Sequence, residues 1–190
     1  TTGTNNTLIG GLAGDAITTG ANNTALGRGS LGANTTGASN VALGYSALTS
    51  NTTAANNVAI GMEAAVSNTT GTSNVAVGFE ALKANTTADN NTAVGKSALN
   101  ANTTGTRNTS VGATSGALIT TGNYNTLLGW TAGQAITTAD DNVLLGPAAG
   151  NGITTGASNV AVGRSALYLT TTASNNTAVG HQAMSANTTG

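Results

Sequence analysis

An asparagine recurs every 17 residues along the whole chain, and this period limits the possible folds more than any other feature. The asparagines are Asn6, Asn23, Asn40, Asn57, Asn74, Asn91, Asn108, Asn125, Asn142, Asn159 and Asn176. With each Asn counted as position 1, position 5 is always Gly (Gly10 to Gly180), and positions 13 and 14 are always Thr (Thr18 and Thr19 to Thr188 and Thr189). A fixed period without insertions is typical of a solenoid, in which each unit forms one coil and stacks on the next.

The chemistry of the unit predicts a strand rather than a helix. Position 2 is only Val or Thr, and position 4 is only Val, Ile or Leu, which gives the two-residue alternation of a strand. The Gly at position 5 then ends the strand at a turn or a close backbone approach. The sequence therefore predicts an all-β parallel β-solenoid (β-roll) of eleven 17-residue coils that fills residues 1–190 as one repeat array. Coils stacked in register would align the Asn residues of position 1 into an amide ladder and the Thr residues into columns.

Positions 9 and 12 exchange their apolar residue between units. A large residue at position 9, such as Leu31 or Leu82, accompanies Asn or Thr at position 12, whereas Gly at position 9, such as Gly133, accompanies Ile at position 12, such as Ile136. The exception is Ala65, which is paired with Asn68. One apolar group per coil from either position is what a thin, close-packed core of fixed volume requires.

Position 3 is also small or apolar, although it faces opposite to positions 2 and 4. Its residues are Leu8, Ala25, Ala42, Ala59, Ala76, Ala93, Ser110, Leu127, Leu144, Ala161 and Ala178. We expect both strand faces to be buried, and therefore expect self-association that covers position 3 on the outside of the coil. The alternative is an exposed alanine stripe, which is tolerated because Ala is only weakly hydrophobic.

Composition excludes several classes of function. Charged residues make up 6% of the chain and the formal net charge is −1, so no basic surface for nucleic acid is expected. No run of 18 apolar residues is present, so no membrane span is expected. The chain contains no Cys, and its one His, His181, has no partners for a metal site or a catalytic triad.

Three short motifs resemble functional sites only superficially. The segment 27–32 spells GxGxxG and 95–97 spells Gly-Lys-Ser, but both follow from the repeat and no helix is expected after them. Asp140 and Asp141 fall at a predicted turn without further carboxylates. We therefore predict no catalytic, cofactor or metal site, and no enzyme activity.

The most variable position is 6, directly after the invariant Gly. Its large aromatic, apolar and cationic residues form the candidate surface contact column: Arg28, Tyr45, Met62, Phe79, Lys96, Trp130, Arg164 and His181. The alternative is an outward corner that accepts any residue. Asn-Thr-Thr also creates glycosylation acceptor motifs at Asn34, Asn51, Asn68, Asn85, Asn102 and Asn187, which arise from the repeat itself.

The segments NNTAVG (90–95 and 175–180) and SNVAVG (73–78 and 158–163) resemble the repeats of trimeric autotransporter adhesin heads and of bacterial and phage tail-fibre proteins. This resemblance implies a left-handed β-roll, assembled as a parallel homotrimer or filament and displayed outside a cell or on a virion, with a host surface or glycan as partner. Because the array starts and stops inside a repeat, we expect it to be part of a longer fibre or to be continued by neighbouring subunits.

Together these patterns predict the structural shaft of an extracellular fibre or surface adhesin. The alternative function is an ice-binding solenoid that uses its Thr columns.

Overall fold

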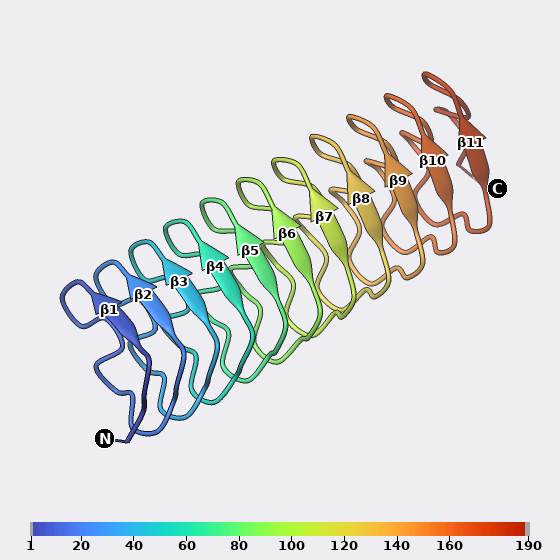
Figure 1. The fold of residues 1–190 in the computed structure, drawn as a ribbon. Coiled ribbons are helices and arrows are strands. Elements are labelled where there is room, and N and C mark those ends of the chain that lie inside the picture. The colour runs from blue at the N-terminus through green and yellow to red at the C-terminus, as the bar shows by residue number, and fades with distance from the viewer. Residues whose placement is uncertain (1, 189–190) are drawn as a thin grey trace.

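The computed structural model describes residues 2–188 and has the form of a rod built from one repeated coil (Figure 1). Eleven strands form a single sheet in which β1 to β11 lie side by side in chain order. Their bounds are Thr7–Ile9, Thr24–Leu26, Val41–Leu43, Val58–Ile60, Val75–Val77, Thr92–Val94, Thr109–Val111, Thr126–Leu128, Val143–Leu145, Val160–Val162 and Thr177–Val179. The predicted parallel β-solenoid with 17-residue spacing is confirmed.

Every strand pair is parallel and keeps the repeat in register. For example, Val58, Ala59 and Ile60 pair with Val75, Ala76 and Val77. Each coil therefore places identical positions directly above one another, and the rod elongates by one strand spacing per coil, about 4.8 Å.

The predicted asparagine ladder at position 1 is present inside the coil. The backbone N–H of Asn40 donates to the side-chain oxygen of Asn23 at 3.0 Å, and its side-chain amide donates to the backbone oxygen of Ala54 at 2.9 Å. The same two bonds recur at Asn57, which is also buried. Each Asn thus links its coil to the preceding one and also closes its own coil, which explains why this amide recurs in every unit.

Position 3 faces the interior, so the expectation that it forms an outer interface is wrong. Ala76, Ala93 and Leu127 are fully buried within a single chain. Because neighbouring residues of a strand point to opposite faces, positions 2 and 4 point outward. Most strands therefore bury Ala at position 3, β8 and β9 bury Leu127 and Leu144 there, and the side chains of positions 2 and 4 face outward.

The exchange between positions 9 and 12 is confirmed by contact distances. Leu at position 9 and Ile at position 12 are both buried. A Cβ added to Gly133 would lie 2.9 Å from Cδ1 of Ile136 and 3.0 Å from Cδ2 of Leu127. Position 3 therefore takes part in this exchange as well, because the side chain of Leu127 fills the space that Leu at position 9 fills in other coils.

A second amide ladder runs through position 12 from Asn34 to Asn102, in five consecutive coils that carry Leu or Ala at position 9. The amide of Asn85 donates to the side-chain oxygen of Asn68 at 2.7 Å, and the amide of Asn102 donates to that of Asn85 at 3.0 Å. The ladder ends where the next coil carries Ile119. The buried side-chain oxygen of Asn102 accordingly has no hydrogen-bond partner among the described residues.

The end of this ladder yields a stability prediction. Gly116→Leu is expected to destabilise the rod by about 1–3 kcal/mol, because the new Cβ would lie 3.1 Å from Cδ1 of Ile119 and 2.7 Å from Cδ1 of Leu127. Adding Ile119→Asn should recover part of this loss, since it frees volume and supplies a donor for Asn102. Chemical denaturation of the two single variants and the double variant measures the coupling, and simple additivity would contradict the shared volume.

Candidate functional site

The outward face of the sheet carries a continuous row of apolar and Thr side chains, which we call the strand-face stripe. It comprises positions 2 and 4 of every unit. The residues of position 2 are Thr7, Thr24, Val41, Val58, Val75, Thr92, Thr109, Thr126, Val143, Val160 and Thr177. The residues of position 4 are Ile9, Leu26, Leu43, Ile60, Val77, Val94, Val111, Leu128, Leu145, Val162 and Val179. Ile9, Leu128 and Val179 are 57%, 50% and 69% exposed. Large exposed apolar surfaces usually mark interaction sites.

The strand-face stripe contains no charged residue in any of its eleven strands. Two such stripes could meet without placing like charges together or burying an unpaired ion. With strands about 4.8 Å apart, the stripe extends over roughly 50 Å. Its shape and chemistry suit a long, dry contact with another flat apolar surface.

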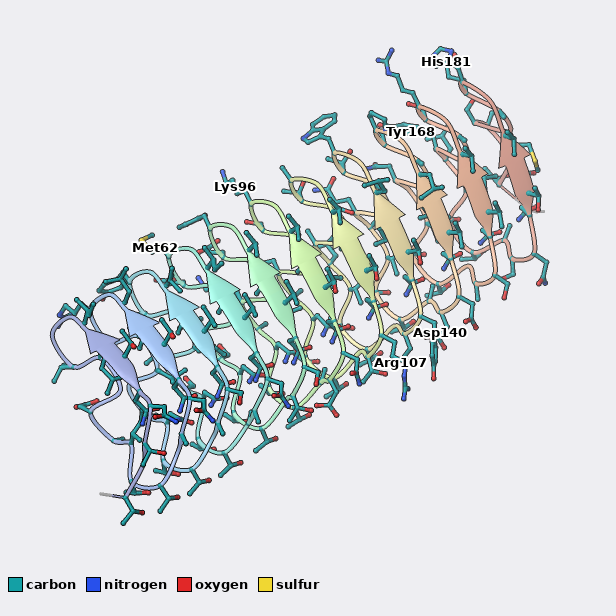
Figure 2. The ribbon with its side chains drawn as sticks, viewed as in Figure 1. Met62, Lys96, Arg107, Asp140, Tyr168 and His181 are labelled. Carbon is teal, nitrogen blue, oxygen red and sulfur yellow. The ribbon has the colours of Figure 1, made fainter. Side chains whose placement is uncertain are left out.

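The position 6 residues follow the strand-ending glycines and lie along one edge of the rod. Figure 2 shows Met62, Lys96 and His181 on this edge, with Tyr168 of position 10 beside them. Every residue of the predicted contact column is exposed: Arg28, Tyr45, Met62, Phe79, Lys96, Trp130, Arg164 and His181. The structure thus brings these residues to one edge of the rod and spreads them over ten coils, and of the eight only Trp130 and Arg164 line the same depression.

Two arginines stack on tyrosines of the next coil. The guanidinium of Arg28 lies 5.8 Å from the ring centre of Tyr45, at the column, and that of Arg107 lies 5.4 Å from the ring of Tyr124, at position 17. Arg107 also donates a 2.9 Å hydrogen bond to the Tyr124 hydroxyl. These cations are therefore already engaged within the chain.

The sequence did not single out the exposed residues of positions 10 and 11. Tyr168 is 40% exposed and Leu169 is 52% exposed, and both lie beside the column. Tyr168 is the only aromatic residue at position 10, and position 11 is Ala, Ser or Gly in every unit except those of Leu118 and Leu169. This contrast with the other units is the sequence signal that could have identified Tyr168 and Leu169.

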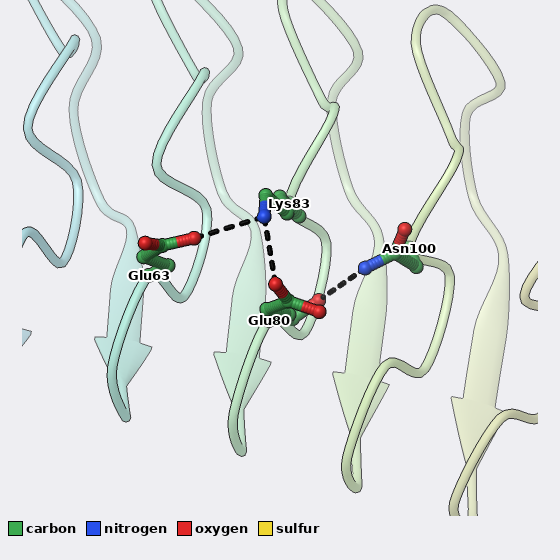
Figure 3. A network of polar contacts seen from close by, with 4 residues as sticks. All are labelled: Glu63, Glu80, Lys83 and Asn100. Carbon is green, nitrogen blue, oxygen red and sulfur yellow. Dashed lines mark hydrogen bonds and ion pairs between the residues drawn. The ribbon is translucent and has the colours of Figure 1, made fainter.

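A small ion network connects positions 7 and 10 of adjacent coils (Figure 3). The ammonium of Lys83 lies 2.9 Å from Glu63 and 2.7 Å from Glu80, and the amide of Asn100 donates to the backbone oxygen of Glu80 at 3.2 Å. Hydrogen bonds to Glu80 and then Glu63 raise the pKa of Lys83 above its ordinary value. Both carboxylates contact this one cation, so the cluster links neighbouring coils electrostatically.

The nucleotide-like motifs do not form phosphate sites. Gly27 ends β2 with φ at +135°, and the chain continues through turns, so no helix N-terminus follows to bind a pyrophosphate. Gly95 ends β6 in the same way. Among residues 2–188, no group of three His, Cys, Asp or Glu residues is placed to hold a metal ion, and no helix is long and apolar enough to cross a membrane.

Five of the six glycosylation acceptors are core residues. Asn34, Asn51, Asn68, Asn85 and Asn102 are buried at position 12; the amide of Asn34 donates to the backbone oxygen of Gly37, and the other four amides donate along the ladder. A sugar on any of these amides would displace both the ladder and the core, so the folded rod cannot carry it there.

The two Thr columns differ in their environment. The hydroxyl of Thr69, at position 13, donates to the backbone oxygen of Thr86 at 3.0 Å, and the same bond recurs along the column. Thr70, at position 14, is exposed, as is its equivalent in each described coil. Thr189, the last of these, lies outside the described residues. Between Thr18 and Thr155, the exposed Thr hydroxyls of these two columns that make no hydrogen bond within the chain therefore form a single row, at position 14.

Comparison with models of known protein families gives no match, and comparisons with curated proteins and with solved structures give none either. No family is assigned. Function is therefore inferred from the geometry of the rod and its surfaces.

Proposed function

We propose that this chain is a non-catalytic structural rod, the shaft of an extracellular fibre or surface adhesin on a cell or virion. The observation that carries this proposal is the strand-face stripe, an uncharged, half-buried to exposed surface of Val, Leu, Ile and Thr that is continuous through all eleven strands. Such a surface is poorly suited to permanent contact with water, and a second copy offers a matching surface of the same length and period.

We further propose that three copies pack in parallel with their stripes around a common axis, and that the coils are left-handed. The trimer and the handedness are supported by the resemblance of the NNTAVG and SNVAVG segments to adhesin-head and tail-fibre repeats. In this arrangement positions 2 and 4 form the trimer core, while the position 6 column and the Thr70 column stay outside.

Charged substitutions in the stripe test the proposal. Ile60→Glu combined with Leu128→Glu should convert the trimer to monomers, because each carboxylate would enter an apolar contact beside its symmetry copies. Light scattering after size-exclusion chromatography should give three times the chain mass for the wild-type protein and one chain mass for the variant. Circular dichroism should show the same β-structure in both.

A matched control places the same two charges outside the proposed contact. Thr70→Glu combined with Thr138→Glu adds two exposed carboxylates at position 14 in comparable coils. This variant should remain trimeric. A wild-type protein that stays monomeric at high concentration, or an Ile60→Glu/Leu128→Glu variant that keeps its full mass, would refute association through the stripe.

A further inference from the structure

A depression of about 440 Å³ lies on the position 6 edge, toward the C-terminal end of the described rod. Four consecutive coils form it, from the turn after β8 to the turn after β11. Its lining residues are Trp130, Pro147, Ala148, Arg164, Ser165, Tyr168, Leu169, Gln182, Ser185 and Ala186. The volume falls within the range of small-molecule sites, about 300–1,000 Å³.

Aromatic residues are concentrated at this depression. The chain has only five aromatic residues, one Trp, three Tyr and one Phe, and two of them, Trp130 and Tyr168, line it. Their side chains remain 63% and 40% exposed, so the rings are available to a ligand. An exposed aromatic ring suits a ligand that has an apolar face and a polar rim.

Polar donors with no partner of their own surround these rings. Arg28 and Arg107 stack on tyrosines and Lys83 pairs with two glutamates, but within residues 2–188 the guanidinium of Arg164 makes no hydrogen bond, ion pair or stacking contact. The side chains of Gln182 and Tyr168 likewise make no hydrogen bond in the described part of the chain. No Asp or Glu lines the depression, so its charge is positive.

We propose that this depression binds an acidic saccharide, a pyranose ring that carries a carboxylate. The C–H face of the sugar would stack on Trp130 or Tyr168, and the guanidinium of Arg164 would donate two parallel hydrogen bonds to the carboxylate. Gln182 and Ser165 supply donors and acceptors for the ring hydroxyls. A neutral apolar ligand would leave Arg164 unused, whereas an acidic saccharide uses both the rings and the cation.

The site lies within one chain, and no residue of the strand-face stripe lines it. Saccharide binding therefore goes beyond the shaft function, and it requires neither the trimer nor any contact through positions 2 and 4. Ile60→Glu alone, which lies in the coil of β4 and outside the coils that form the depression, should bind the sugar as the wild-type protein does, which separates the two proposals experimentally.

Trp130 is the only tryptophan of the chain, so its fluorescence reports directly on the depression. Titration of the wild-type protein with glucuronate should change this fluorescence saturably, whereas glucose should bind at least about 10-fold more weakly, because it lacks the charge-assisted pair. A glucuronate-terminated oligosaccharide forms the second arm. Equal affinity for glucuronate and for the oligosaccharide identifies the single acidic ring as the ligand. A preference for the oligosaccharide identifies a longer glycan chain as the ligand.

Arg164→Gln should weaken glucuronate binding by about 10-fold or more and leave glucose binding unchanged. Lys96→Gln is the matched control, because it removes one exposed cation from the same edge outside the depression. Tyr168→Ala, which keeps the Trp130 signal, should weaken both sugars. Linear, unsaturable quenching by glucuronate and glucose alike, or unchanged glucuronate affinity in Arg164→Gln, would overturn the proposal.

Discussion

Replacement of Leu127 with Glu is expected to unfold the coils around it, whereas the same change at the adjacent Leu128 should leave a single chain folded. Leu127 is 0% exposed and Leu128 is 50% exposed. A carboxylate at position 127 would be buried among apolar side chains without a partner, at a cost of about 4 kcal/mol or more. At position 128 it would reach water in the free chain, so the loss should stay within about 1 kcal/mol.

Urea denaturation followed by circular dichroism measures both changes, and it should be done at a concentration where the chain is monomeric. The two substitutions introduce the same side chain into the same strand, so β-propensity and net charge are matched. A larger loss of stability at position 128 than at 127 would mean that the strand faces are assigned the wrong way round.

Gly95→Ala is expected to cost about 3 kcal/mol or more of stability, although it adds only one methyl group. Gly95 has φ at +132°, a conformation that side chains disfavour, and the added Cβ would lie 2.6 Å from the carbonyl carbon of Gly112. That neighbour is backbone held in the coil stack, so it cannot move aside as a flexible side chain could. Thermal or chemical denaturation of the variant measures the cost.

Gly180→Ala separates the two causes of this loss. Gly180 has a similar φ of +126°, but the nearest atom to its added Cβ is the Cβ of Ala183, at 3.9 Å. The expected loss of stability in Gly180→Ala therefore comes from backbone strain alone and is roughly 1–3 kcal/mol. Equal losses at the two glycines would show that the stacking clash contributes nothing.

The two-residue alternation of the strand was readable from the sequence, but the direction of its faces was not. The sequence predicts Ala at position 3 as an outer residue because Val and Leu at positions 2 and 4 are larger and more apolar. In the structure the opposite wall of the coil already contributes Leu82 or Leu99 of position 9 to the core, so only a small side chain fits at position 3 beside them. The small size of Ala at position 3 reflects the small volume inside the coil, and it does not indicate that the residue is exposed.

A signal for the correct face was present in the repeat. Leu8, Leu127 and Leu144, the only leucines of position 3, occur in units that have Gly at position 9. Such compensation requires both positions to share one volume, and therefore places position 3 inside. The exchange between positions 9 and 12 is a compensation of the same kind, and it is visible when the two positions are taken together in every unit.

The candidate surfaces were predictable to different degrees. The position 6 column was found because variability beside an invariant Gly indicates an outward corner. The depression could not be found in that way, because Trp130 and Tyr168 are 38 residues apart in sequence and occupy different positions of the unit. Only the geometry of the coils brings the two residues to the same depression.

The backbone hydrogen bonds between coils run along the length of the rod, since successive strands pair side by side in chain order (Figure 1). Tension along the rod therefore pulls directly against these bonds, and a coil at an end can detach before the next one is loaded. A detached coil of 17 residues extends to roughly 55–60 Å, against about 4.8 Å in the stack. Stretching would thus release about 50 Å per coil in equal steps, so the rod could absorb mechanical shock by lengthening gradually instead of breaking at once.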